Sequence, residues 1–212
     1  MRFKVCCIQS KGEAETAIKA GAWAIGLVAA MPSGPGPIDD ARIVAISEAT
    51  KGRVKRFLLT SRTRPDDVVD HILRCGCDVV QLVDDVPVQA YAAIREECKD
   101  VQIAQVIHVQ GPEALAQAQS AAPYCDYILL DSGRTDGPMK VLGGTGRTHN
   151  WDISRSIVEA LRLPVILAGG LNPDNLATAC RAVSPDAFDV CSGLRGPEMA
   201  LDAQKLAAFA AH

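Results

Sequence analysis

The sequence predicts an α/β fold, a single (β/α)8 barrel formed by residues 1–212, and three observations support this prediction. Short apolar segments alternate strictly with segments of helical character, which favours parallel strands joined by right-handed crossovers. There are eight such units, the number that closes a barrel, and 212 residues are enough to build one. An open doubly wound sheet, the alternative, usually has fewer strands.

The first four units have recognisable helix ends. Gly21 suits the residue that follows a helix, an acidic turn opens the second helix, and Pro65 stands where a missing N–H is tolerated. The segment 31–37 contains three prolines and two glycines, so we expect a loop. The expected strand and helix pairs are 5–8 with 13–20, 22–29 with 39–50, 54–59 with 65–74, and 78–83 with 87–98.

The last four units follow the same pattern, with a long polar loop after the sixth strand. Asn172 is expected to cap the seventh helix, with Pro173 as its first residue. The expected pairs are 101–109 with 112–120, 126–131 with 151–161, 164–168 with 172–183, and 187–191 with 200–210.

Charge and hydropathy exclude several classes of function. The formal net charge is −3, so no overall basic field attracts nucleic acid or anionic lipid. No apolar run reaches the roughly 18 residues of a membrane span, and the first residues lack the apolar stretch of a secretory signal. We therefore expect a cytoplasmic protein that binds a small molecule, without a nucleic-acid or membrane partner. Monomer and homodimer are both open.

Eight cysteines are many for such a chain. No CxxC pair occurs, and the spacing of Cys75 and Cys77 is not a zinc pattern, so no metal site is predicted. Most lie in apolar segments, where free cysteine behaves as a small hydrophobic residue. They are Cys6, Cys7, Cys75, Cys77, Cys98, Cys125, Cys180 and Cys191.

One apolar strand ends abruptly on a carboxylate. Tyr127-Ile-Leu-Leu-Asp131 precedes a polar loop that contains Gly143-Gly-Thr-Gly-Arg-Thr-His-Asn150. The last residue of a strand buried on both faces is the first that can present a charge to a ligand, and glycines let backbone N–H groups approach an anion. This stretch alone supports a phosphate-binding site and an ordinary turn about equally.

The barrel fold indicates where a site would lie. Chemistry in these barrels occurs at the C-terminal ends of the strands, and the last two loops often bind phosphate through backbone N–H groups. Gly169-Gly170 and Ser192-Gly193 stand at those two positions, which favours phosphate binding over two plain turns. The other polar candidates at strand ends are Cys6 or Cys7, Arg62, Gln81, His108, Asp131 and Asp189.

Several motifs together resemble the phosphoribosylanthranilate isomerase family, barrels of the ribulose-phosphate-binding type. They cover nearly the whole chain, and the long motifs after the sixth and seventh strands are the most specific. The matching stretches are Lys4-Val-Cys6, Val80-Gln81-Leu82, Leu129-Leu-Asp131, Gly143-Gly-Thr-Gly-Arg-Thr-His-Asn-Trp151, Leu167-Ala-Gly-Gly-Leu-Asn-Pro-Asp-Asn175 and Asp189-Val-Cys-Ser-Gly193.

The resemblance implies an Amadori rearrangement of N-(5-phosphoribosyl)anthranilate in tryptophan biosynthesis. It assigns Asp131 as the acid that opens the furanose ring to a Schiff base, and Cys6 as the base that removes the C2 proton. Cys6 must then be partly thiolate, with a pKa below the usual value of about 8.5. No metal or organic cofactor is implied, because the iminium is the electron sink.

The resemblance also implies the substrate contacts. Backbone N–H groups around Gly169, Gly170, Ser192 and Gly193 are expected to bind the phosphate, while Gly144 and Thr145 close over the substrate. Gln81 and Asp189 match family positions on the fourth and eighth strands. Asp189 suits a substrate contact and a buried structural carboxylate equally well.

Two departures from the family pattern lie on the aglycone side of the site and beside the base. The loop 31–37 lacks the arginine that pairs with the anthranilate carboxylate, for which Arg62, His108 and Arg134 are substitutes. Cys7 replaces a glycine, and strand alternation is expected to turn it away from Cys6. Two alternatives therefore accompany the isomerase hypothesis: an isomerase of another phosphoribosyl amine or sugar phosphate, and a non-catalytic phosphate-binding barrel.

Overall fold

The fold is given by a computed structural model that describes residues 1–133 and 148–212. The strands in this part of the chain are β1 (Phe3–Val5), β2 (Ala24–Val28), β3 (Lys55–Thr60), β4 (Val79–Leu82), β5 (Gln102–His108), β6 (Tyr127–Asp131), β7 (Val165–Leu167) and β8 (Ala187–Val190). The α-helices are α1 (Lys11–Lys19), α2 (Asp40–Thr50), α3 (Pro65–Cys75), α4 (Val88–Glu97), α5 (Glu113–Ala121), α6 (Trp151–Ala160), α7 (Leu176–Val183) and α8 (Ala203–Ala210). Short 3-10 helices are η1 (Ala122–Tyr124), η2 (Ser192–Leu194) and η3 (Pro197–Met199).

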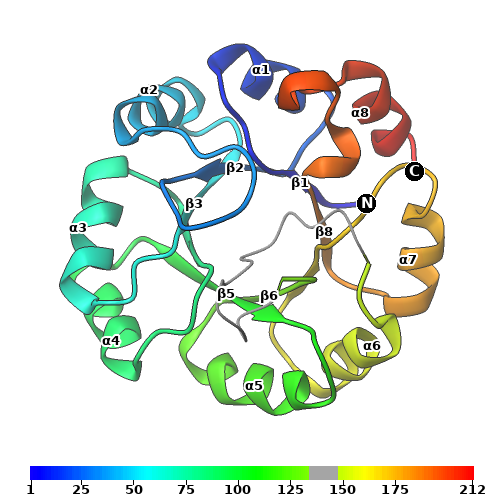
Figure 1. The fold of residues 1–212 in the computed structure, drawn as a ribbon. Coiled ribbons are helices and arrows are strands. Elements are labelled where there is room, and N and C mark those ends of the chain that lie inside the picture. Colours follow the sequence, from blue (N-terminus) through cyan, green and yellow to red (C-terminus); the bar gives the residue numbers. More distant parts are fainter. Residues whose placement is uncertain (134–147) are drawn as a thin grey trace.

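The strands form a closed parallel barrel in chain order. Each strand pairs with the next, and β8 returns to pair with β1 through Lys4 opposite Asp189 and Val5 opposite Val190. Figure 1 looks along the barrel and shows the helices as an outer ring. The predicted fold class, an α/β chain forming a (β/α)8 barrel, is confirmed.

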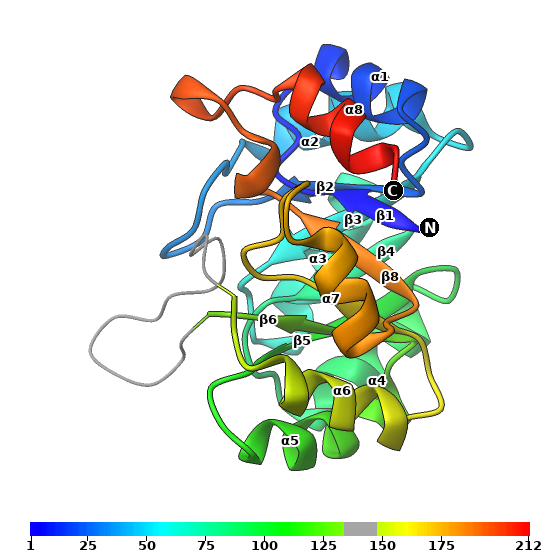
Figure 2. The same ribbon diagram turned by 90° about the vertical axis from the view of Figure 1, so that its right-hand side faces the viewer.

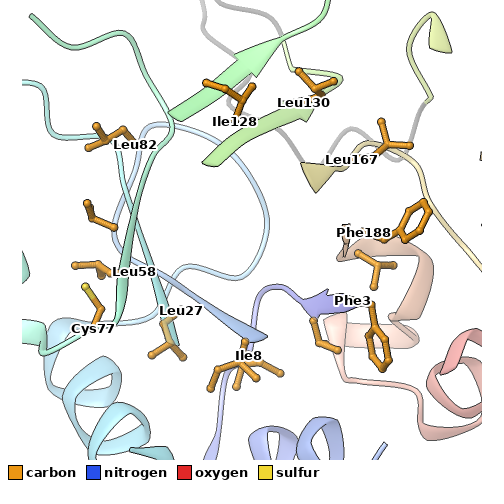
Figure 3. Packing of buried hydrophobic residues seen from close by; sticks show 14 of the residues in the cluster. Phe3, Ile8, Leu27, Leu58, Cys77, Leu82, Ile128, Leu130, Leu167 and Phe188 are labelled. Carbon is orange, nitrogen blue, oxygen red and sulfur yellow. The ribbon is translucent and has the colours of Figure 1, made fainter. Parts of the chain in front are cut away.

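Two apolar layers bury the strands on both faces. Leu58, Ile128 and Leu130 belong to the layer between strands and helices, and Figure 3 shows them on the outside of the strand ring. Phe57 and Leu129 belong to a second, smaller layer inside the barrel. Because successive side chains of a strand alternate between faces, polar residues in register with the inner layer point into the barrel.

The helix ends match the local sequence. Ser10 caps α1 by accepting the N–H of Glu13, and Asp39 caps α2 by accepting the N–H of Arg42. Pro65 opens α3, which ends at Gly76 in the left-handed conformation that glycine adopts without strain.

Three predicted elements differ from the structure by three residues or more at one end. The eighth helix, expected from residue 200, begins at Ala203, because Asp202 caps it by accepting the N–H groups of Gln204 and Lys205. The first strand, expected over 5–8, lies at Phe3–Val5, so Cys6 follows the strand. The seventh helix begins at Leu176 because Asn172 caps a preceding turn: its side chain accepts the N–H groups of Asp174 and Asn175 at 2.9 and 3.1 Å.

Loops after the strands gather at one end of the barrel. Figure 2 shows the blue loop between β2 and α2 and the orange loop between β8 and α8 projecting from the same end. Among the described helices, none combines the length and the apolar character that crossing a membrane requires.

Candidate active site

A pocket opens at the C-terminal ends of the strands. β1 and β6, which deliver its cysteine and carboxylate, are separated in the ring by β7 and β8 (Figure 1). Most of the predicted site residues line this one space. They are Cys6, Gln81, Asp131, Gly169, Gly170, Asp189 and Ser192. Gly144 and Thr145 lie outside the described residues.

Cys6 shares a confined space with a lysine that sequence reasoning did not single out. A Cβ added to Gly26 of β2 would stand 2.8 Å from the Cys6 sulfur and 3.1 Å from Lys4 Nζ, so both groups fill the room that the glycine leaves. A hydrogen bond from Cys7 and the charge of Lys4 lower the pKa of the Cys6 thiol, against the opposing effect of burial. The thiolate is thus favoured, as a basic role requires.

Lys4 is fully buried and forms an ion pair across the β1–β8 seam. Its Nζ lies 2.8 Å from Asp189 Oδ2. Burial works against the ammonium, but the Asp189 carboxylate raises the pKa of Lys4, which keeps the lysine charged beside Cys6. The two residues are 185 positions apart, so no local sequence signal could reveal the pair.

The expected orientation of Cys7 is wrong. Cys7 lines the same pocket as Cys6 because β1 has already ended and the Cys7 backbone takes a left-handed conformation, with φ of 61°. Strand alternation therefore does not extend to it. Its sulfur also lies 3.4 Å from the Pro35 carbonyl oxygen, which is an alternative acceptor to Cys6 for the single thiol proton. Interactions with the Cys191 and Cys6 thiols raise the pKa of Cys7, which keeps it protonated.

A buried arginine holds the backbone of both cysteines. Arg195 Nη2 donates to the carbonyl oxygens of Cys6 and Cys7 at 2.6 and 2.8 Å. Its Nη1 pairs with both carboxylate oxygens of Glu13 at 3.0 and 2.9 Å. The turn that carries the thiols is therefore fixed by α1 and by the chain after β8, and sequence reasoning missed this contact as well.

Asp131 ends β6 on the inner face. Its Oδ1 accepts the backbone N–H of Ser132 at 2.7 Å, and the residue lines the pocket. A carboxyl group anchored on one oxygen can transfer a proton with the other.

The glycine motifs after β7 and β8 form bare backbone. Gly169 and Gly170 have φ of 86° and 65°, a region that side chains disfavour. Gly193 lies behind Ser192, and a Cβ there would stand 1.9 Å from the Leu171 carbonyl oxygen. Only glycine permits this contact between the two loops, whose amides suit an anionic ligand.

Two buried oxygens in the pocket lack a hydrogen-bond donor within the described part of the chain. They are Gln81 Oε1 and Asp189 Oδ1, on residues that are 4% and 7% exposed. Both oxygens are covered by protein atoms although their residues line the pocket, and buried acceptors of this kind are rarely left unpaired.

The three cations considered for an aglycone carboxylate have separate outcomes. Arg62 and His108 do not line the pocket, and His108 Nε2 is 2.9 Å from the Val83 carbonyl oxygen. Arg134 lies outside the described residues. Among the described lining residues, the aglycone side is apolar and includes Val28, Met31, Pro35, Leu59, Val83 and Val106.

One group of potential metal ligands lies away from the pocket. Ligand atoms of Asp40, His71 and Cys75 come within 4.8 Å of one another between α2 and α3. Their hydrogen bonds already have protein partners: His71 contacts Thr60 and Asp40, and Arg74 pairs with Asp40 at 2.8 Å. We interpret the group as a link between two helices.

Comparison with known proteins gives a consistent result over the full chain. Residues 3–210 match the family model for N-(5'phosphoribosyl)anthranilate (PRA) isomerase. An N-(5'-phosphoribosyl)anthranilate isomerase of Halobacterium salinarum is 35% identical, with 99% of this chain and 94% of the relative covered. One from Methanocella arvoryzae is 33% identical, with 98% and 95% covered.

Solved structures agree on the fold. The phosphoribosyl anthranilate isomerase of Thermus thermophilus has a TM-score of 0.81 and 27% identity, covering 100% of this chain and 97% of its own. Another phosphoribosyl anthranilate isomerase was solved in complex with reduced 1-(o-carboxyphenylamino)-1-deoxyribulose 5-phosphate. It has a TM-score of 0.80 and 23% identity, with 99% and 96% covered.

Proposed function

The chain belongs to the N-(5'-phosphoribosyl)anthranilate isomerase family, and from that premise we propose how its pocket performs the reaction. The protein is an isomerase, an intramolecular oxidoreductase that converts an aldose to a ketose. It rearranges N-(5-phosphoribosyl)anthranilate to 1-(2-carboxyphenylamino)-1-deoxyribulose 5-phosphate in tryptophan biosynthesis. The observation that supports our assignment of roles is that Cys6 and Asp131 line one pocket.

Asp131 acts first, as the general acid. It gives its proton to the furanose ring oxygen, the bond between that oxygen and C1 breaks, and the C1–nitrogen bond becomes an iminium. Its anchored Oδ1 and its place at the end of β6 support this role. A positioned proton donor of this kind is typically worth about 10² to 10⁴ in rate.

Cys6 acts second, as the general base. Its thiolate takes the proton from C2, the electron pair moves into the iminium, and the resulting enolamine tautomerises to the ketone. The nearby Lys4 ammonium and the Cys7 thiol support this role, because both favour the thiolate. Arg195 supports it further by holding the backbone from which the sulfur projects.

The phosphate is proposed to bind at the bare backbone between β7 and β8. The backbone N–H groups of Gly169, Gly170, Ser192 and Gly193 are the proposed donors, and three of these four residues have no side chain to obstruct an anion.

Gln81 and Asp189 are proposed to bind the sugar. Both residues line the pocket, and each has one buried oxygen without a hydrogen-bond donor in the described part of the chain, which supports contacts with the hydroxyl groups of the substrate.

The test is turnover of N-(5-phosphoribosyl)anthranilate by purified Cys6→Ala and Asp131→Asn variants, followed by fluorescence. Each variant should lose about 10² to 10⁴ in kcat, because each removes one proton transfer. Cys180→Ala, which alters an exposed cysteine, is the matched control and should keep wild-type activity. If a folded Cys6→Ala variant turned over the substrate at the wild-type rate, the assignment of Cys6 as the general base would be refuted.

A further inference from the structure

Three of the eight cysteines, Cys6, Cys7 and Cys191, line the pocket together. The isomerase reaction as proposed uses only one of them. Cys6 and Cys7 are 5% and 3% exposed, and Cys191 is partly exposed, so the pocket is the route by which a small molecule reaches them.

The barrel seam explains why these thiols meet. Val5 is opposite Val190 in the β1–β8 register, and the Cys6 N–H donates to the Val190 carbonyl at 2.8 Å, so Cys6 and Cys191 follow neighbouring strands at the same level. The left-handed backbone of Cys7 turns its thiol back to them. Cys7 interacts through its sulfur with both Cys6 and Cys191.

The three thiols differ in reactivity. Cys6 shares the space beside Gly26 with the Lys4 ammonium, which stabilises its thiolate. Thiolates are the form that attacks peroxides, so Cys6 is the first target. Burial raises the pKa of Cys77 to about 12, and neither Cys77 nor Cys98 lines the pocket.

We propose that Cys6, Cys7 and Cys191 form a hydroperoxide-reactive site in which oxidation begins at Cys6 and ends as a disulfide between Cys7 and Cys191. In the first step the Cys6 thiolate attacks the hydroperoxide. A sulfur–oxygen bond forms, the O–O bond breaks, and Cys6 becomes a sulfenic acid, while the departing alkoxide or hydroxide takes up a proton from solvent and leaves as an alcohol or water.

Cys7 then attacks the Cys6 sulfur. A sulfur–sulfur bond forms, and the sulfenic oxygen leaves as water with the Cys7 proton. A disulfide between adjacent residues is strained, because a trans peptide holds their Cα atoms about 3.8 Å apart and disulfides usually span about 4.4 to 6.8 Å. Strained disulfides exchange readily.

Cys191 completes the sequence by attacking the Cys7 sulfur. Its thiol proton is released, the Cys7–Cys191 bond forms, and Cys6 leaves as a thiolate. One hydroperoxide and two thiols have then become an alcohol or water, a second water and one disulfide. The pair thereby returns Cys6 to its reduced form. The benefit to catalysis rests on the proposed function, whereas the thiol chemistry rests on the cluster alone.

The experiment treats the reduced full-length protein with one equivalent of hydrogen peroxide, alkylates the remaining thiols and maps tryptic peptides by mass spectrometry. Cys6 and Cys7 fall within the peptide 5–11, and Cys191 within 182–195. We expect these two peptides to be cross-linked, with the alkyl group on Cys6. Oxidised Cys6 without a cross-link, or no reaction at the cluster, would overturn the proposal.

Variants test the order of the steps. Cys191→Ser should lose the cross-link and stop at the Cys6–Cys7 disulfide, seen as a peptide 5–11 that is two hydrogens lighter and carries no alkyl group. Cys6→Ala should form the cross-link between Cys7 and Cys191 much more slowly. A wild-type rate of cross-linking in Cys6→Ala would overturn the assignment of Cys6 as the first target. Cys180→Ser is the control and should behave as wild type. Cross-linking is measured by mass spectrometry and does not depend on isomerase activity. If the wild type formed the cross-link and Cys6→Ala kept full isomerase activity, the role of Cys6 as the catalytic base would be refuted, but the thiol chemistry would not.

Discussion

Among individual residues, Cys7 stands out because it combines an unfavourable backbone conformation with a position beside the base. Its φ of 61° costs most residues roughly 1 to 3 kcal/mol, and glycine far less. The thiol also stabilises the charged form of Cys6. Cys7 therefore costs backbone strain and at the same time stabilises the Cys6 thiolate. A substitution by glycine removes both the strain and the thiol, and the pH dependence of activity then reports the effect of the thiol alone.

Cys7→Gly is expected to move the pH profile of the reaction. Without the Cys7 hydrogen bond the pKa of Cys6 rises, and a base works only above its pKa, so the acidic limb of kcat/KM should shift to higher pH. Activity at high pH should approach that of the wild type. The measurement is kcat/KM against pH, with Cys77→Ala as a control outside the pocket. An unmoved acidic limb would contradict the role of Cys7.

Lys4→Met should affect stability and catalysis together. Lys4 and Asp189 are 0% and 7% exposed, so the substitution leaves a buried carboxylate without a counter-charge, at a cost of roughly 3 to 5 kcal/mol. Burial then raises the folded-state pKa of Asp189 further, so stability is complete at acidic pH and declines as pH rises through that pKa. Denaturant unfolding at several pH values measures both effects.

The double variant Lys4→Met with Asp189→Asn separates the two roles of the lysine. An uncharged amide needs no counter-charge, so stability should recover relative to Lys4→Met and lose its dependence on pH. Activity should stay low, because the positive charge beside Cys6 is still missing. Recovery of activity in the double variant would show that Lys4 does not act on the base.

At the scale of elements, β2 contributes to the site through a glycine, because the missing side chain leaves space for the catalytic groups. Gly26 faces the inner layer, where Cys6 and Lys4 occupy the space of its missing side chain. Gly26→Ala should displace the sulfur, lowering kcat/KM and reducing stability by about 1 to 3 kcal/mol, the usual cost of overpacking. Gly12→Ala in α1 is the control, because its Cβ would meet only Ser10 Oγ at 3.7 Å. Enzyme assays and unfolding curves measure both variants.

Most elements could be predicted from the sequence because the strands are short and mainly apolar and many helices have a local end signal. Asp131 could be placed for the same reason, since it ends such a run. The predictions for β1 and α7 were less accurate where side-chain hydrogen bonds or a left-handed residue interrupt the regular pattern, as at Cys7 and Asn172. Those features depend on contacts that periodicity does not record.

For the whole molecule, the fold could be predicted from the number of strand–helix units, but the supports of the site could not. Lys4 with Asp189, and Arg195 with Glu13, join residues more than 180 positions apart. Each partner looks like an ordinary charged residue in its own segment. These partners meet only because β1 pairs with β8 and closes the barrel. The charged groups around Cys6 are therefore in place only when the whole barrel has formed.

Arg195 gives the sharpest test of that dependence. It is 4% exposed and ties the Cys6 and Cys7 carbonyls to Glu13 of α1. Arg195→Met should cost roughly 3 to 5 kcal/mol by leaving the Glu13 carboxylate without its counter-charge, which lowers Tm by roughly 10 °C for a domain of this size. Because the thiol turn loses its anchor, kcat/KM should fall at temperatures where the variant is still folded.

Arg53→Met is the matched control, since Arg53 also pairs with a glutamate of α1, Glu15, but on an exposed surface. Exposed ion pairs contribute little because solvent screens them, so Tm and kcat/KM should stay within error of the wild type. Calorimetry and steady-state assays on both variants give the comparison. If the two substitutions lowered Tm equally, burial of the Arg195 pair would not be what stabilises the seam. If Arg195→Met lost stability but kept full kcat/KM, Arg195 would not be needed to position Cys6 for catalysis.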